Sequence, residues 1–146
     1  VISDYDKGYL SEDDLWIVCN NINRPVFVDT KKRRLFQKDN VYWKINKKEY
    51  DDLIQDHLPN LSNLIVTLGS AGASWNGMIF QPQVVKVFDV CGAGDTFLAA
   101  LVVEFLKTRN MQTALEVANK AAAIAVTHPG AYYLTKKDIE SLHEKI

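Results

Sequence analysis

Cysteine and histidine, which often reveal metal or disulfide chemistry, are scarce in this sequence. Its 146 residues include 2 cysteines and 3 histidines. Cys19 and Cys91 lie far apart in unlike surroundings, which indicates free thiols in a reducing cytoplasm and not a disulfide framework. The histidines have no ligand-like spacing with one another or with the cysteines, so a structural zinc site is not expected.

The sequence also has no large net charge of either sign. The chain has 17 basic and 18 acidic residues and a net charge of −1, which argues against a nucleic-acid partner. No apolar run approaches transmembrane length and no charged-then-apolar leader opens the chain, so no membrane partner is expected. The sequence begins at Val1 with no methionine, already within a strand-like run, and this predicts that it is part of a longer polypeptide.

Alternating strand-like and helix-like segments are present, and 47% of the residues are hydrophobic. This pattern predicts a single α/β domain over residues 1–146, with a mostly parallel Rossmann-like sheet, helices on both faces and ligands at the carboxyl ends of the strands. The expected strands are residues 1–3, 26–29, 41–46, 64–68 and 84–88, with a hairpin over 74–80. The expected helices begin near residues 11, 47, 94, 111 and 135, and those from 47 and 111 are expected to reach 58 and 127.

Residues 87–101 carry the strongest chemical signal. An extended run ends at Asp89, and Gly92 and Gly94 precede an apolar helix that begins with Asp95. Backbone N–H groups at such a helix start attract phosphate. Asp95 would repel phosphate, but it suits a base that accepts a proton from an attacking hydroxyl. The alternative is structural, because acids cap helices and Gly-x-Gly is common in turns.

Two other nucleotide motifs do not fit this turn. A Walker loop requires Gly-Lys-Ser/Thr, and a dinucleotide fingerprint of an oxidoreductase would place a third glycine at Phe97. The extended string, with Asp89, Gly92, Ala93, Gly94, Asp95 and Phe97, resembles the D-x-x-G-A-G-D-x-F motif of ribokinase-like (PfkB) carbohydrate kinases. The resemblance implies transfer of the ATP γ-phosphoryl group to a sugar hydroxyl, with Asp95 as base and an anion hole at residues 92–94.

Two further motifs precede this turn in the order that the family shows. Asn46-x-x-Glu49 follows an expected strand; its structural interpretation is a helix cap, whereas the resemblance implies that Glu49 positions Mg²⁺ through water with Asn46 as partner. Thr67-x-Gly69-x-x-Gly72 resembles the nucleotide segment, although a plain strand-to-hairpin turn explains it as well.

The resemblance also implies two less specific sites. Asn119 matches a place near the adenine pocket, with a plain exposed polar residue as the alternative. Several family members hold a monovalent cation such as K⁺ with backbone carbonyls. The matching positions here are Asp89, Cys91, Ala125, His128 and Gly130.

Residues 4–8 and 29–32 are similar to segments of the heptose 7-phosphate kinase branch of the family. Lysines there would attract phosphate, whereas a solvated basic loop over residues 31–34 is the simpler alternative. Lys44-Ile45-Asn46 departs from the Thr-Pro-Asn of that branch.

The resemblance therefore implies the C-terminal half of a cytoplasmic kinase that uses ATP and Mg²⁺ on a sugar or sugar phosphate. The N-terminal half, which would grip the sugar, has no counterpart in this sequence. The alternative is a nucleotide-binding module without activity of its own. Exposed sheet edges would promote association of copies.

Overall fold

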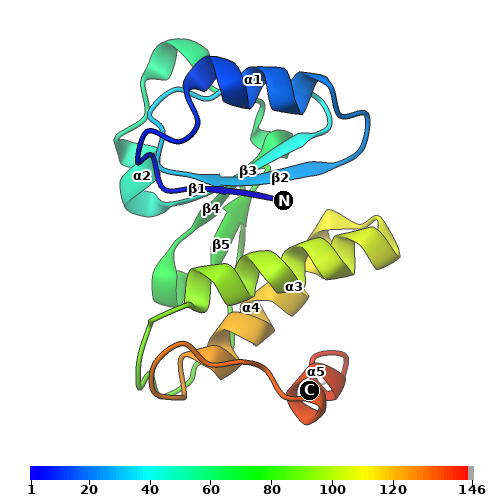
Figure 1. Ribbon diagram of the computed structural model, residues 1–146. Helices are drawn as coiled ribbons and strands as arrows, with labels where there is room; N and C mark the ends of the chain where they lie inside the picture. The colour runs from blue at the N-terminus through cyan, green and yellow to red at the C-terminus, as the bar shows by residue number, and fades with distance from the viewer. Residues whose placement is uncertain (145–146) are drawn as a thin grey trace. The chain divides into compact units, whose positions relative to one another are not determined.

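The structure is a computed structural model that describes residues 1–144. The chain divides into two compact units (Figure 1). The first unit comprises residues 1–69 and 74–79, and the second comprises residues 70–73 and 80–146. The single domain expected over the whole chain stays a prediction.

The sheet of the first unit confirms the predicted α/β class. Within residues 1–144 it has six strands that follow sequence order from β1 to β6. The first four strands are parallel, as expected for strands joined by crossover connections. Their bounds are β1 (Ile2–Asp4), β2 (Val26–Thr30), β3 (Val41–Asn46) and β4 (Leu64–Thr67).

The sheet ends in the hairpin that Asn76-Gly77 predicts. Strand β5 (Ala73–Trp75) turns into β6 (Met78–Phe80) through these two residues, and both have positive φ, 51° and 77°. A two-residue turn of this kind matches the twist of the strands that it joins. Short 3₁₀ turns lie nearby at η1 (Gln55–His57), η2 (Leu61–Asn63) and η3 (Gly69–Ala71).

Helix α1 (Glu12–Asn20) begins where the sequence predicts, with a capping box in which Ser11 and Asp14 exchange side-chain and backbone hydrogen bonds. Its buried side is narrow. Leu15 and Cys19, four residues apart, are buried, but Trp16, Ile17 and Val18 are exposed. A helix that covers one face of a sheet with such a stripe leaves its flanks in solvent.

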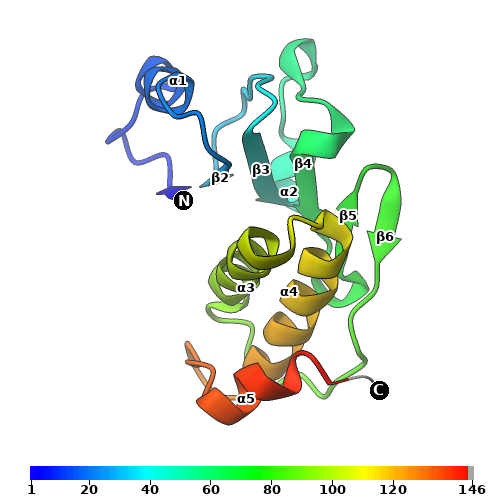
Figure 2. The ribbon, with the colours of Figure 1, turned by 90° about the vertical axis from the view of Figure 1, so that its right-hand side faces the viewer.

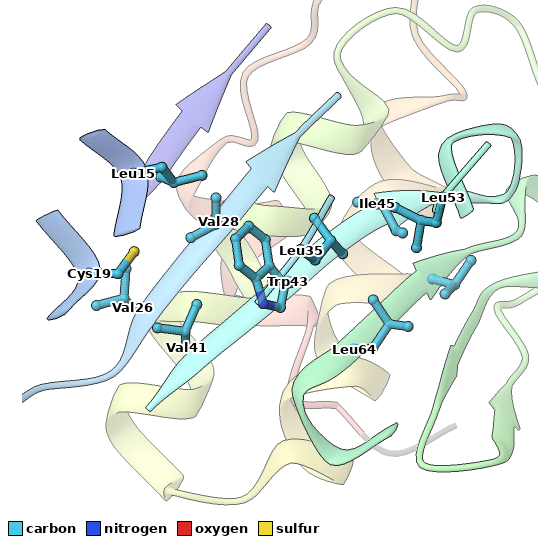
Figure 3. Packing of buried hydrophobic residues seen from close by; sticks show 11 residues of the cluster. Leu15, Cys19, Val26, Val28, Leu35, Val41, Trp43, Ile45, Leu53 and Leu64 are labelled. Atoms are coloured by element: carbon cyan, nitrogen blue, oxygen red, sulfur yellow. The ribbon is translucent and has the colours of Figure 1, made fainter. Parts of the chain in front are cut away.

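The core of the first unit lies between α1 and one face of the sheet (Figure 3). Trp43 is fully buried at its centre, and its indole N–H donates to the Phe36 carbonyl at 3.0 Å. The Phe36 ring stands edge-on to the Trp43 ring, with centroids 4.9 Å apart. Around them pack the buried side chains of Leu15, Cys19, Val26, Val28, Leu35, Val41, Ile45, Leu53, Leu64 and Val66.

The second unit is helical. Helix α3 (Ala93–Thr108) packs on α4 (Met111–Ala125), and α5 (Lys136–Ser141) follows (Figure 2). The small side chains of α4 allow this close packing, since Ala114, Ala118, Ala121 and Ala125 are all buried. Among residues 1–144, no helix combines the length and apolar character needed to cross a membrane.

Two expected elements are wrong. Helix α2 spans only Lys47–Asp51 and does not reach residue 58. Acidic residues at its C-terminus oppose the helix dipole, and the Ile54 N–H donates to the Arg33 carbonyl instead of continuing the helix. Residues 84–88 do not form a strand, and the Phe88 N–H donates to the carbonyl of Val126 after α4.

Candidate functional site

The turn before α3 has an unusual helix start. Gly92, the residue that precedes the helix, has φ of 73° and makes no side-chain capping bond. A β-carbon at this position would lie 3.4 Å from the Ala131 β-carbon. That distance is ordinary van der Waals contact, so glycine is favoured here by its positive φ, and it leaves the helix start without a side-chain cap.

The amides of this turn have different partners. The Ala93 N–H donates to the Val90 carbonyl at 3.2 Å, and the Thr96 N–H donates to the Gly92 carbonyl at 2.9 Å. Gly94 is exposed in the first helical turn, where N–H groups have no acceptor within the helix. Such groups bind anions readily, because the helix dipole places partial positive charge beside them.

Asp95 lies in this first turn and is exposed. Its carboxylate makes no capping bond to the helix start. The interpretation of this acid as a simple N-cap is therefore wrong, because the capping position belongs to Gly92. The carboxylate lies beside the first-turn amides, where the dipole stabilises negative charge.

Asp89, which precedes the turn, holds it in place through hydrogen bonds to its carboxylate. Its two carboxylate oxygens accept hydrogen bonds from the N–H groups of Cys91 and Gly130, each at 2.9 Å. These backbone hydrogen bonds, that from Cys91 first, hold the pKa of Asp89 below its usual value. The Asp89 N–H also donates to the Val126 carbonyl at 3.2 Å. The turn before α3 is thus tied to the loop after α4.

These bonds bring together the two segments expected to hold a monovalent cation. Residues 89–91 meet residues 125–130. The Ala125 carbonyl accepts the His128 N–H at 3.1 Å, and the His128 ring stacks on Tyr132 with centroids 3.7 Å apart. The cation itself stays a prediction.

In the first unit, Asn46 and Glu49 form a capping box. The Asn46 carboxamide accepts the Glu49 N–H, and Glu49 Oε2 accepts the Asn46 N–H, each at 2.8 Å. The capping interpretation is confirmed. One carboxylate oxygen of the half-buried Glu49 lies outside this box, so the cap does not prevent a second role.

Polar groups gather at the carboxyl ends of β3 and β4. Asn46 and Thr67 are register partners, and the Thr67 hydroxyl donates to the Ile45 carbonyl at 3.4 Å. Gly69 follows with φ of 59°, exposed and with open space beside its α-carbon. This edge of the first unit has the composition expected of a ligand site in a parallel sheet.

A tightly bound metal does not fit this donor set. Among residues 1–144, no group of three or more histidine, cysteine, aspartate or glutamate side chains is placed to hold a metal ion. A single carboxylate such as Glu49 suits magnesium, which keeps several of its waters in protein sites.

Gly72 and Asn119, both in the second unit, meet at one carbonyl group. The Asn119 carboxamide donates to the Phe80 carbonyl at 2.7 Å. Asn119 is only 5% exposed, so its interpretation as an exposed polar residue is wrong. Gly72 has φ of 92° and approaches the same carbonyl so closely that a β-carbon would lie 2.0 Å from its oxygen.

The substitution Gly72→Ala is expected to destabilise the protein by about 1–3 kcal/mol, because it adds a backbone clash to a strained φ. The midpoint of urea unfolding measures the loss. The control is Gly77→Ala. Gly77 has φ of 77° and open space beside it, so this substitution introduces backbone strain but no clash. Equal losses in the two variants would contradict the role of the Phe80 contact.

Sequence reasoning missed the buried ion pairs at the ends of β1 and β2. Lys32 is buried, with its ammonium 2.8 Å from Asp6 and 3.4 Å from Asp4. The Thr30 hydroxyl donates to Asp4 at 3.0 Å. Burial alone would lower the pKa of Lys32, but the hydrogen bond and charge of Asp6 and the charge of Asp4 outweigh it and raise this pKa. The expectation of a solvated basic loop is therefore wrong for Lys32.

Neighbouring lysines differ in exposure. Lys31 is exposed, with its ammonium 5.1 Å from the centre of the Tyr5 ring. Lys44, where the strand departs from Thr-Pro-Asn, is buried and pairs with Asp29 at 2.7 Å. Asp29 and Lys44 are register partners on β2 and β3, a pairing that strand spacing alone would not reveal.

The two units thus define an α/β protein with an uncapped, glycine-led helix start followed by an exposed acid. The sequence model of the pfkB family of carbohydrate kinases matches residues 40–138. The chain belongs to this family.

Known proteins agree with this assignment. The chain is 34% identical over 165 aligned residues to the bifunctional protein HldE of a Nitratiruptor species, covering 100% of this chain and 36% of that protein. The fold is similar to ribokinase from Thermotoga maritima, with a TM-score of 0.71 and 20% identity over 97% of this chain and 55% of that one. Ribokinase from Arabidopsis thaliana, complexed with ribose and ATP, gives a TM-score of 0.61 and 22% identity over 81% and 47%.

The chain spans about a third of the length of the curated relatives it matches.

Proposed function

We propose that this chain carries the catalytic turn of an ATP-dependent kinase that phosphorylates a hydroxyl group of a sugar or sugar phosphate. The observation that carries the proposal is the helix start at Gly92, uncapped and followed by the exposed Asp95. Membership of a carbohydrate kinase family supports the reaction type.

The chemistry follows from the residues of the turn. The Asp95 carboxylate accepts the proton of the attacking hydroxyl, which makes its oxygen a better nucleophile. The N–H groups of Gly92, Ala93 and Gly94 stabilise the charge that develops on the transferred phosphoryl group. Because Ala93 also donates to Val90, the two glycines are the stronger donors in this proposal.

The remaining roles rest on the resemblance to the family. Thr67, Gly69, Gly72 and Asn119 would contact the nucleotide, and Asn46 would orient Glu49. Glu49 would hold magnesium through water, and the bound ion neutralises phosphate charge. Carbonyl groups of residues 89, 91, 125, 128 and 130 would hold a monovalent cation such as K⁺.

A sugar phosphate of the heptose type is the proposed acceptor. Residues 4–8 and 29–32 resemble that branch of the family, and the exposed Lys31 supplies a cation for a phosphate group. Free thiols at Cys19 and Cys91 fit a reducing cytoplasm.

A second candidate is a nucleotide-binding module without catalytic activity. The chain matches only 36% of its HldE relative, which favours this alternative for the chain taken alone. Calorimetric titration with ATP and magnesium, beside a phosphoryl-transfer assay on sugar phosphates, separates the two. We expect ATP to bind; binding with turnover supports the kinase, and binding without turnover supports the module. Absence of ATP binding would contradict both.

A further inference from the structure

A buried polar cluster joins the loops that follow β1 and β2. The Lys32 ammonium donates to Asp6 at 2.8 Å and lies 3.4 Å from Asp4 Oδ2. Asp4 accepts the Asp6 N–H with one carboxylate oxygen and the Thr30 hydroxyl with the other, each at 3.0 Å. The Thr30 hydroxyl oxygen accepts the Lys32 N–H at 3.1 Å. Asp4, Thr30 and Lys32 are all buried, so the cluster fixes the two loops against each other.

Stability alone does not account for this cluster. A buried ion pair can often be exchanged for apolar side chains of similar volume without loss of stability. Asp6 also has φ of 52°, a conformation that residues other than glycine adopt at an energetic cost. Its N–H bond to Asp4 and its ion pair with Lys32 maintain that conformation. Backbone strain of this kind concentrates at ligand-binding sites.

Two exposed side chains alternate with the cluster, Tyr5 in the first loop and Lys31 in the second. The Lys31 N–H donates to the Asp4 carbonyl at 3.2 Å, and the Lys31 ammonium lies 5.1 Å from the centre of the Tyr5 ring. Contact with the ring restricts a side chain that has several rotatable bonds. This restriction lowers the entropic cost of binding a ligand.

Lys31 keeps an unpaired charge because Lys32 pairs with the neighbouring acids. Over residues 1–144, Asp4 and Asp6 form ion pairs with Lys32, and no acid forms one with Lys31. Without Lys32, the two carboxylates would compete for Lys31 and repel an approaching anion. An exposed ammonium that is held in place and has no acid partner suits a phosphate group.

We propose that Lys32 and Tyr5 are positioning residues for Lys31, which they hold in place for the phosphate group already present on the acceptor. Lys32 neutralises Asp4 and Asp6 and fixes their loop, and the Tyr5 ring orients the Lys31 side chain. All three residues lie at or near the carboxyl ends of β1 and β2, the end of a parallel sheet where ligands bind. The identity of the bound group rests on the proposed kinase function.

Titration of the chain with inorganic phosphate, followed by two-dimensional NMR, tests the site without requiring turnover. We expect saturable shifts of the Tyr5 and Lys31 signals that sodium chloride at matched ionic strength does not produce. Lys31→Met should weaken binding at least about tenfold. Arg24→Met, which removes an exposed cation at the amino end of β2, should leave it unchanged. Absence of saturable shifts in the unmodified chain would overturn the proposal.

Variants of the two positioning residues separate their roles. Tyr5→Phe keeps the ring and should retain phosphate binding, whereas Tyr5→Leu should weaken it about two- to fivefold. Lys32→Met should weaken it about tenfold, because two unneutralised acids then face Lys31. If Lys32→Met does not fold, the charge-neutral double variant Asp4→Asn with Lys32→Met replaces it and should also weaken binding. Equal affinities of Tyr5→Phe and Tyr5→Leu, or full affinity in the folded Lys32 variant, would overturn the positioning roles.

Substrate selectivity gives a second measurement, in a preparation of the full-length polypeptide that shows turnover. Lys32→Met should raise KM for a sugar phosphate about tenfold, with little change in kcat or in kcat/KM for the same sugar without phosphate. Equal losses on both substrates would refute the positioning role and leave the proposed function intact. Phosphate binding at Lys31 without turnover of any sugar would support the phosphate site and contradict the proposed function.

Discussion

Replacing Asp95 by asparagine is expected to lower the rate of phosphoryl transfer by about 10²- to 10⁴-fold while ATP binding is retained. Asparagine has nearly the same shape but cannot accept the proton of the attacking hydroxyl. The amides of Gly92 and Gly94 keep their positions, because Asp95 takes no part in capping the helix. Steady-state kinetics with a sugar phosphate, in a preparation of the full-length polypeptide that shows turnover, measure the loss in kcat.

The matched control is Asp13→Asn. Asp13 is also an exposed acid in the first turn of a helix, at α1 in the other unit. Its replacement should leave kcat unchanged, since the local effect on helix stability is small. An Asp95→Asn enzyme with undiminished turnover would refute the role of Asp95 as base, whereas loss of both turnover and ATP binding would indicate a damaged turn.

Truncation of Trp43 to alanine is expected to destabilise the first unit by about 3–5 kcal/mol. The indole is fully buried between α1 and the sheet, contacts Phe36 and donates to its carbonyl. The substitution removes apolar contact, leaves a cavity and deprives a carbonyl of its donor. Urea unfolding followed by far-ultraviolet circular dichroism measures the change.

Trp16→Ala provides the comparison for the same residue type. Trp16 also stands edge-on to Phe36, with centroids 4.9 Å apart, but it is 43% exposed on the flank of α1. Its loss should cost about 1 kcal/mol, since much of its surface is already in water. Similar losses in the two variants would show that the core of the first unit is not organised around Trp43.

Strand positions were predictable because their signals are local. Short apolar runs ending in polar residues marked β2, β3 and β4, and Asn76-Gly77 marked the hairpin. The starts of helices that have a capping box, as at Ser11 and Thr135, could be predicted equally well. The end of α2 could not be predicted, because it depends on a hydrogen bond from the Ile54 N–H to the Arg33 carbonyl, which joins segments distant in the sequence.

The motifs of the proposed site could also be predicted from the sequence. The order of Asn46-x-x-Glu49, Thr67-x-Gly69-x-x-Gly72 and the turn at residues 92–95 was sufficient to predict a family that the comparison with known proteins then confirmed. The burial of individual polar side chains could not be predicted from the sequence. Asn119 and Lys32 are polar residues with no local feature that distinguishes them from exposed ones, and their burial depends on partners far along the chain, Phe80 and Asp4.

The sequence by itself determined the α/β class, the family and the glycine-led turn, because these depend on residue type and short spacing. Tertiary structure alone decided that Asp89 accepts a hydrogen bond from Gly130 and that Lys32 pairs with Asp4 and Asp6. The physical reason is the same in each case. A side chain's desolvation and its partners are set by residues that become neighbours only when the chain folds.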